Sequence, residues 1–107
     1  MVANLINENG RAVANQFVIV ENDGTIAFQS YDSRVCEIRD GRGMGYDNVV
    51  VLGNDWNYSR TTMKHLVLFL RQNGLGVLGC AKDIYEAIDR GHARNDEAIA
   101  VWVDTTM

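Results

Sequence analysis

An amphipathic helix is predicted where the sequence reads WNYSRTTMKHLVLFL, residues 56–70. Ser59 is a suitable N-cap, because its hydroxyl can accept a hydrogen bond from an amide one turn later. At about 100° per residue, one arc of the helix collects its apolar side chains, Met63, Leu66, Val67, Phe69 and Leu70. Gly74 supplies a stop, so the helix is expected to run from Ser59 or Arg60 to Asn73. Each buried side chain of this kind contributes about 1.5–3 kcal/mol, so packing on a sheet is expected to fix the helix.

The chain before this helix predicts an antiparallel meander. Its strands are expected at residues 17–20, 26–31, 36–39 and 48–52, with an edge strand or ordered arm at residues 2–6. Residues 17–20 (FVIV) are apolar at every position, which predicts a strand covered on both sides. Asn22-Asp23-Gly24 favours a tight hairpin. In the third strand, Cys36 and Ile38 alternate with charged residues, so one face of the sheet is expected to lie in water.

Two further elements are predicted after the first helix. Residues 81–90 predict a second helix that ends at Gly91, and residues 98–103 predict a final strand inserted in the sheet. A meander, two helices and a strand, in that order, predict an α+β fold in two layers. The 107 residues contain no linker or internal repeat, so a single domain over residues 1–107 is expected.

The composition is that of an ordinary globular protein, with 47% apolar and 22% charged residues. The net charge of −4 disfavours a general nucleic-acid-binding protein, although it leaves room for one basic face. The N-terminus lacks a basic segment followed by a long apolar run, and no apolar run is long enough to span a bilayer. A cytosolic protein that does not contact the membrane is therefore expected.

The start of the first helix is the strongest candidate for a binding site. Capping hydroxyls and cations coincide there, in Ser59, Arg60, Thr61, Thr62 and Lys64. Cations in the first turn oppose the helix dipole, and each one destabilises the helix by up to about 1 kcal/mol. Capping alone therefore does not explain why Arg60 and Lys64 are there. These two share a stripe with Arg71 beside Leu68, which points away from the apolar arc. Free amides, hydroxyls and cations together are typical of a site for phosphate or for a partner's carboxylates.

A plainer interpretation competes with this site, and the sequence favours it. The helix is then an ordinary capped helix whose basic side chains pair with Asp47 or Asp55, since solvated basic stripes are common and contribute little. Trp56 is expected to staple the preceding loop to the sheet. For Tyr58, a staple and a contact with a nucleic-acid base or protein partner are equally supported.

The glycine-rich segment GRGMG, residues 41–45, resembles a phosphate-binding loop only in composition. It lacks the Gly-Lys-Ser/Thr ending of such loops, and no helix directly follows it. A flexible hairpin connection is expected, in which Arg42 and Met44 are placed to reach a partner.

No arrangement typical of catalysis is visible in the sequence. Cys36 and Cys80 are expected to be buried thiols rather than a disulfide. His65 and His92 do not lie at metal-ligand spacing, and the carboxylates are scattered. A cysteine nucleophile paired with His65 by the fold has no support in the sequence. The protein is therefore expected not to be an enzyme and to use no metal or cofactor.

Three segments resemble a family of small uncharacterised proteins of bacteriophages and prophages. They are ANQFVI at residues 14–19, FQSYDS at residues 28–33 and WNYSRTTMKHL at residues 56–66, which follow the patterns ANQFVI, FQSYxS and WxYSxTTxKxL. The resemblance covers roughly residues 14–70. It implies the cytoplasm of a bacterial host during infection or lysogeny, and it implies no reaction.

The leading hypothesis is a non-enzymatic, phage-encoded accessory protein that binds a host or phage macromolecule. The expected partner is a protein, such as host machinery or a defence system that this protein inhibits. The residues expected to bind are Arg42, Tyr58, Ser59, Arg60, Thr61, Thr62, Lys64 and Leu68. The alternative is a nucleic acid or phosphate ligand at the start of the first helix. A homodimer through Leu68 or a sheet edge remains open.

Overall fold

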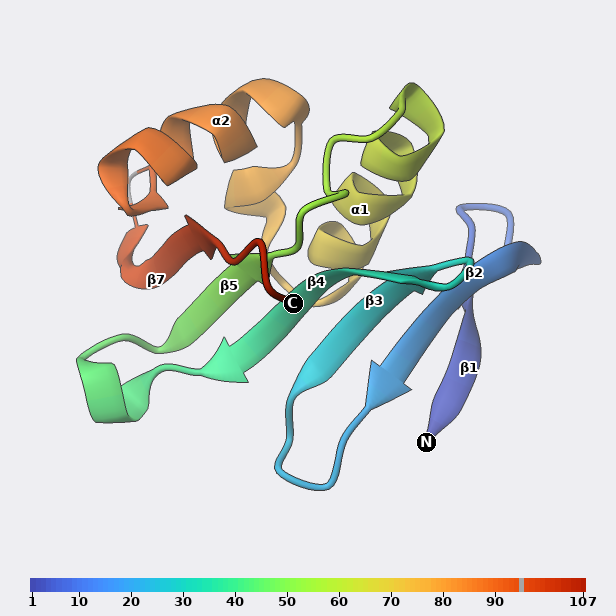
Figure 1. Cartoon of the computed structure of the whole chain (residues 1–107), viewed down its shortest axis with the longest axis horizontal. Helices are drawn as coiled ribbons and strands as arrows, with labels where there is room; N and C mark the ends of the chain where they lie inside the picture. Colours follow the sequence, from blue (N-terminus) through green and yellow to red (C-terminus); the bar gives the residue numbers. More distant parts are fainter. Residues whose placement is uncertain (95) are drawn as a thin grey trace.

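The computed structural model describes residues 1–94 and 96–107; there, a seven-stranded sheet forms one layer of the fold and two helices form the other (Figure 1). The strands are β1 (Val2–Ile6), β2 (Ala12–Val20), β3 (Ile26–Ser30), β4 (Ser33–Asp40), β5 (Asn48–Leu52), β6 (His92–Ala93) and β7 (Asp96–Val103). The helices are α1 (Arg60–Gln72) and α2 (Ala81–Arg90), with 3₁₀ turns η1 (Arg42–Met44) and η2 (Gly76–Leu78). The predicted α+β class is confirmed.

The strand order in the sheet is β1-β2-β3-β4-β5-β7-β6. The first five strands form the predicted antiparallel meander, in which residues 2–6 are the edge strand β1. The chain then passes through both helices and returns as β7, which pairs in parallel with β5 and aligns Val101 with Val50. The predicted final strand is therefore inserted in the sheet, between β5 and the short β6.

Helix α1 has the bounds and the apolar face that the sequence predicts. It begins after the N-cap Ser59 and ends at the C-cap Asn73, before Gly74 in the left-handed conformation (φ 78°). Leu66, Phe69 and Leu70 are fully buried against the sheet. The Phe69 ring stacks on Phe28 of β3 with ring centroids 5.5 Å apart. This packing fixes the position of α1 on the sheet.

None of the helices in the described ranges is long and apolar enough to cross a membrane.

The prediction that residues 17–20 are covered on both sides is wrong. Val18 lies opposite Phe28 and packs on the core beneath α1, whereas Phe17 and Ile19 lie on the other face and are half-buried. Both helices cover the same face of the sheet, so no second layer of the described chain covers the opposite face of β2 (Figure 1). A run that is apolar on both faces does not by itself show how many layers cover it.

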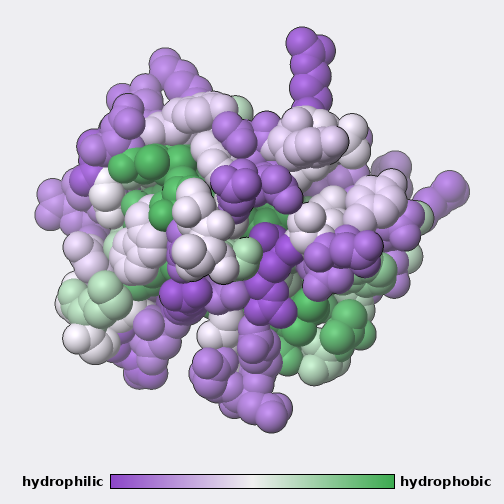
Figure 2. Space-filling view, in the orientation of Figure 1, coloured by the Kyte–Doolittle hydropathy of each residue, from purple (hydrophilic) through white to green (hydrophobic). Residues whose placement is uncertain are grey.

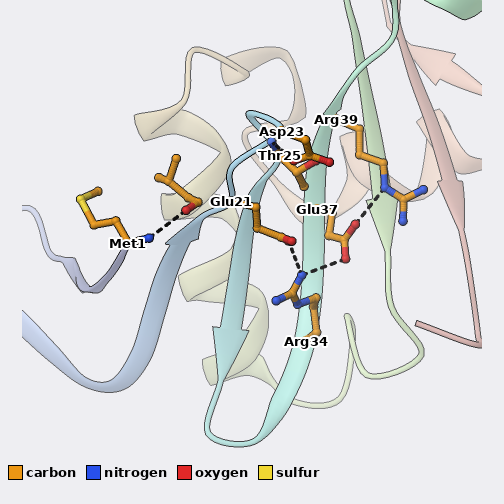
Figure 3. Close-up of polar contacts among 8 residues, drawn as sticks. Met1, Glu21, Asp23, Thr25, Arg34, Glu37 and Arg39 are labelled. Atoms are coloured by element: carbon orange, nitrogen blue, oxygen red, sulfur yellow. Dashed lines mark hydrogen bonds and ion pairs between the residues drawn. The ribbon is translucent and has the colours of Figure 1, made fainter.

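Ion pairs cross the open face of the sheet, as the alternation in the third predicted strand indicates. Arg34 contacts Glu21 at 2.6 Å and Glu37 at 3.1 Å, and Arg39 contacts Glu37 at 2.8 Å (Figure 3). Toward β7, the same face buries a small apolar cluster around Val51. The surface in Figure 2 is mostly hydrophilic, with an apolar patch over the β1–β2 edge, where Val2 and Ile6 are exposed.

We expect Leu66→Ala to lower the free energy of unfolding by about 2–5 kcal/mol, because it opens a cavity between α1 and the sheet. Leu68→Ala is the matched control: Leu68 is only partly buried, so its loss should be less than about 2 kcal/mol. Urea unfolding of both variants checks this. Equal losses would contradict the assigned burial of α1.

Candidate functional site

The start of α1 is capped as predicted and keeps free amides. The Ser59 hydroxyl accepts a hydrogen bond from the Thr62 amide at 3.1 Å and lies 3.0 Å from the Thr62 hydroxyl. The Met63 amide donates to the Ser59 carbonyl oxygen. Among the described residues, no acceptor lies within hydrogen-bonding distance of the Arg60 and Thr61 amides. The helix start therefore retains two donors for a ligand or water.

The predicted site residues divide between two flanks of α1. Four of them line a pocket of about 570 Å³, called here the hydroxyl pocket: Tyr58, Ser59, Thr61 and Thr62. Three others line a groove of about 580 Å³, called here the basic groove: Arg60, Lys64 and Leu68. The cations and the hydroxyls that the sequence groups at the helix start therefore line different flanks of α1.

The structure does not bring Arg42 to either flank. Arg42 lies in η1, and its guanidinium contacts the Asp40 carboxylate at 2.8 Å and 3.0 Å. These hydrogen bonds lower the pKa of Asp40 to about 2. Strand β5 runs from this loop toward α1, so its length separates Arg42 from the helix start (Figure 1). The segment at residues 41–45 is the predicted hairpin connection between β4 and β5, and it includes the 3₁₀ turn η1.

Aromatic side chains around the helix start have two different environments. Trp56 is only 5% exposed and packs against Tyr85 of α2 with ring centroids 4.9 Å apart. Trp56 is buried, as a staple requires, but this contact is with α2, whereas the sequence predicts a contact with the sheet. Tyr58 is 80% exposed and lies on the hydroxyl pocket. Tyr58 is therefore free to contact a ligand.

The basic groove runs between the β1–β2 turn and the outer face of α1. Arg60, Lys64 and Arg71 line it from the helix, and Glu8 lines it from the turn. Within the described chain, no carboxylate lies within 4.0 Å of Arg60 or Lys64. The expected pairing of these cations with Asp47 or Asp55 is therefore wrong.

The groove floor is apolar where α1 approaches the sheet. The lining side chains of this kind are Val13, Met63, Val67 and Leu68. Leu68 also packs against the core and is partly buried, rather than pointing freely into water. Arg71 donates to the Gly79 carbonyl oxygen at 2.7 Å, which holds its guanidinium at the end of the groove. The groove thus combines cations at its rim with an apolar floor.

His65 and Cys80 also line the basic groove. The Nδ1 atom of His65 is buried and has no hydrogen-bond partner among the described residues. Burial lowers the pKa of His65, and the charge of Lys64 lowers it further. No hydrogen bond joins His65 to Cys80 in the described part of the chain, so the contact that activates a cysteine nucleophile is not formed.

The two cysteines differ from each other. Both are free thiols, as predicted. Cys36 is fully buried, and burial raises the pKa of its thiol. Cys80 is exposed at the N-cap position of α2, so the prediction that it is buried is wrong. As the N-cap residue of α2, Cys80 has an extended backbone, and its side chain makes no capping hydrogen bond.

The hydroxyl pocket contains polar residues that no sequence motif indicates. Gln16 of β2 lies opposite Ser30 of β3, and Ser30 lies opposite Ser33 of β4. All three line the pocket, beneath the start of α1. In the sequence, Gln16 is visible as a glutamine within the largely apolar segment ANQFVI. The strand pattern alone does not show which element covers that face of the strand.

The Gln16 side chain is 3% exposed, and its Oε1 atom has no hydrogen-bond partner within the described residues. An unpaired buried acceptor of this kind costs about 1–3 kcal/mol. Two non-glycine residues in the left-handed region lie beside it: Asn15 (φ 62°) and Tyr31 (φ 53°). The Tyr31 amide donates to the Asn15 carbonyl oxygen at 2.7 Å, which fixes this backbone. Strained backbone and an unpaired acceptor therefore coincide at one pocket.

The three sequence segments that carry the phage resemblance meet at this pocket. Residues 14–19 supply Gln16, residues 28–33 supply Ser30 and Ser33, and residues 56–66 supply the start of α1.

In the described residues, no group of three or more His, Cys, Asp or Glu side chains is placed to hold a metal ion.

Comparison with known proteins places the chain in a family. It belongs to the family of unknown function DUF8033, whose model matches residues 2–86. The match extends beyond the segments recognised in the sequence on both sides, and it includes all residues that line the basic groove and the hydroxyl pocket. No curated protein and no solved structure matches the chain.

We expect Ser59→Ala to lower the free energy of unfolding by about 1 kcal/mol, because the Thr62 amide loses its acceptor. Thr61→Ala, in the same first turn, is the control and should change stability by less than about 0.5 kcal/mol. Chemical denaturation measures both. A larger loss in Thr61→Ala than in Ser59→Ala would show that the cap is assigned to the wrong residue.

The lowered pKa of His65 predicts a pH-dependent stability. Between about pH 7 and pH 5.5, the unfolded chain takes up a proton at His65 more readily than the folded chain does. The free energy of unfolding therefore decreases as the pH is lowered through this range. His65→Gln should flatten this dependence, as measured by urea unfolding across that range. His92→Gln is the control, and equal flattening in both variants would refute the assignment to His65.

Proposed function

We propose that this is a non-enzymatic binding protein that recognises another protein through the basic groove. The observation that carries the proposal is a pair of exposed cations, Arg60 and Lys64, with no ion-pair partner in the described chain, beside an apolar floor. An acidic segment that also presents an apolar side chain is complementary to both features. Such a segment is the partner chemistry that we propose.

The distribution of cations supports this surface. Among the described residues, four of the ten Lys and Arg side chains form ion pairs: Arg34, Arg39, Arg42 and Arg90. Three of the other six line the basic groove, although the chain carries a net charge of −4. A local cluster of cations on an acidic protein steers an acidic partner to one place on its surface.

A protein partner is favoured over a nucleic acid by the composition of the groove. No aromatic side chain is among the described residues that line it, so a base has no platform on which to stack. Tyr58, which was expected to stack beside Arg60 and Lys64, lies on the other flank of α1. The apolar floor suits a side chain such as leucine better than a sugar–phosphate backbone.

The biological setting that we propose is that of a phage-encoded accessory protein in the cytoplasm of a bacterial host. The support is the resemblance of residues 14–19, 28–33 and 56–66 to proteins of phages and prophages. In that setting the partner is a host or phage protein, and inhibition of host machinery or of a defence system is a role that binding alone can perform.

The test compares two charge-matched double variants in infected or lysogenic cells. Arg60→Ala/Lys64→Ala should lose the stoichiometric protein that co-purifies with the tagged protein. Lys82→Ala/Arg94→Ala removes two exposed cations outside the groove and should retain it. With the purified partner, the first variant should weaken binding by about tenfold or more by calorimetry.

Three results would refute the proposal. They are no stoichiometric protein partner, equal binding by the two double variants, or a partner segment that is basic. Recovery of nucleic acid, released by salt and lost in Arg60→Ala/Lys64→Ala, would replace the protein partner with the alternative ligand.

A further inference from the structure

The hydroxyl pocket holds an acceptor that the described chain leaves unpaired. Gln16 is 3% exposed and lines the pocket, and its Oε1 atom has no hydrogen-bond partner among the described residues. The neighbouring buried polar side chains, Ser30 and Thr62, make no hydrogen bond to it. A buried acceptor without a donor is unfavourable. Oε1 has almost no accessible surface, so the Gln16 amide must turn toward the pocket before a ligand can donate a hydrogen bond to it.

The pocket presents its polar groups in a row. Gln16, Ser30 and Ser33 occupy facing positions on β2, β3 and β4, so their side chains share the face beneath α1. At the end of the row, the Ser33 hydroxyl donates to the Asp55 carboxylate at 3.2 Å. Adjacent strands lie about 4.8 Å apart, so the row offers acceptors over about 10 Å. An extended polar group can contact both ends.

The charge of the pocket favours a cation. Its lining includes the Asp55 carboxylate and no Lys, Arg or His among the described residues. The Thr62 amide already donates to Ser59, so in the first turn only the Arg60 and Thr61 amides are left for an anion, which the Asp55 carboxylate would repel. Two tyrosine rings, Tyr31 (63% exposed) and Tyr58 (80% exposed), line the same pocket. Tyrosine faces attract ammonium and guanidinium groups.

We propose that the hydroxyl pocket is a second binding site, which takes an ammonium or guanidinium group at Asp55 and a second hydrogen-bond donor of the same ligand at Gln16. This site lies on the opposite flank of α1 from the basic groove and uses none of the groove's lining residues. Its volume of about 570 Å³ is in the range of small-ligand sites. The inference goes beyond the proposed protein partner and does not depend on it.

The experiment titrates the ¹⁵N-labelled full chain with capped amino acids that share one backbone and differ in the end group. The probes are the N-acetyl N-methylamides of lysine, arginine, glutamine and glutamate. We expect saturable shifts of the Ser30, Tyr31 and Thr61 amides with the two cations, weaker binding of the glutamine probe, and no binding of the glutamate probe. n-Butylammonium distinguishes the sources: tighter binding than the lysine probe indicates a free amine, and weaker binding indicates a protein side chain.

Variants connect the binding to the assigned residues. Gln16→Leu and Asp55→Asn should each weaken binding of the lysine probe by about tenfold. Gln72→Leu, an exposed glutamine outside the pocket, is the matched control and should leave it unchanged. Gln16→Leu should unfold at the same or a higher urea concentration, because it removes the unpaired acceptor. Asp55 is exposed, so Asp55→Asn keeps the test valid even if Gln16→Leu does not fold.

Three outcomes would overturn the inference. One is the absence of saturable shifts with both cationic probes. Another is binding of the glutamine or glutamate probe as tight as that of the lysine probe. The last is unchanged binding in both Gln16→Leu and Asp55→Asn. Arg60→Ala/Lys64→Ala should leave the lysine probe's affinity unchanged, so failure of the basic-groove proposal is recognised separately.

Discussion

The packing of α1 on the sheet is the constraint on which the rest of the structure depends. Phe69 stacks on Phe28, and Leu66 and Leu70 are buried beside them. Dense packing of this kind leaves a helix little freedom to rotate about its axis. Because the apolar face of α1 is committed to the sheet, each remaining side chain of the helix is assigned to one flank, and the chemistry of both candidate sites follows from that orientation.

The two flanks of α1 differ in charge although they share one helical turn. Arg60 faces the basic groove, whereas Thr61, the next residue, faces the hydroxyl pocket. On the first flank, cations surround an apolar floor; on the second, hydroxyls and a carboxylate surround a buried amide. A ligand suited to one flank is therefore repelled or left unpaired at the other. The electrostatic separation lets a chain of 107 residues offer two unlike surfaces a short distance apart.

Local patterns predicted the elements well and their surroundings poorly. The cap at Ser59, the stop at Gly74 and the apolar arc of α1 depend on residues within a few positions of one another, and the structure agrees with all three. Whether residues 17–20 are covered on one side or two depends on where distant helices settle, and there the prediction failed. Arg42 was grouped with the helix start by residue type alone, and β5 places it elsewhere.

By itself, the sequence determined the helix bounds, the meander, the final strand and the stripe that carries Arg60 and Lys64, since helical and strand periodicities are set by neighbouring residues. Only the tertiary structure decided that Gln16, Ser30 and Ser33 meet under the start of α1. Three strands must pair in one register for these polar side chains to share a face, and register is a property of the sheet. In the described residues, the side-chain oxygen of Gln16, Oε1, is buried there without a hydrogen-bond donor, which no local pattern of residues reveals.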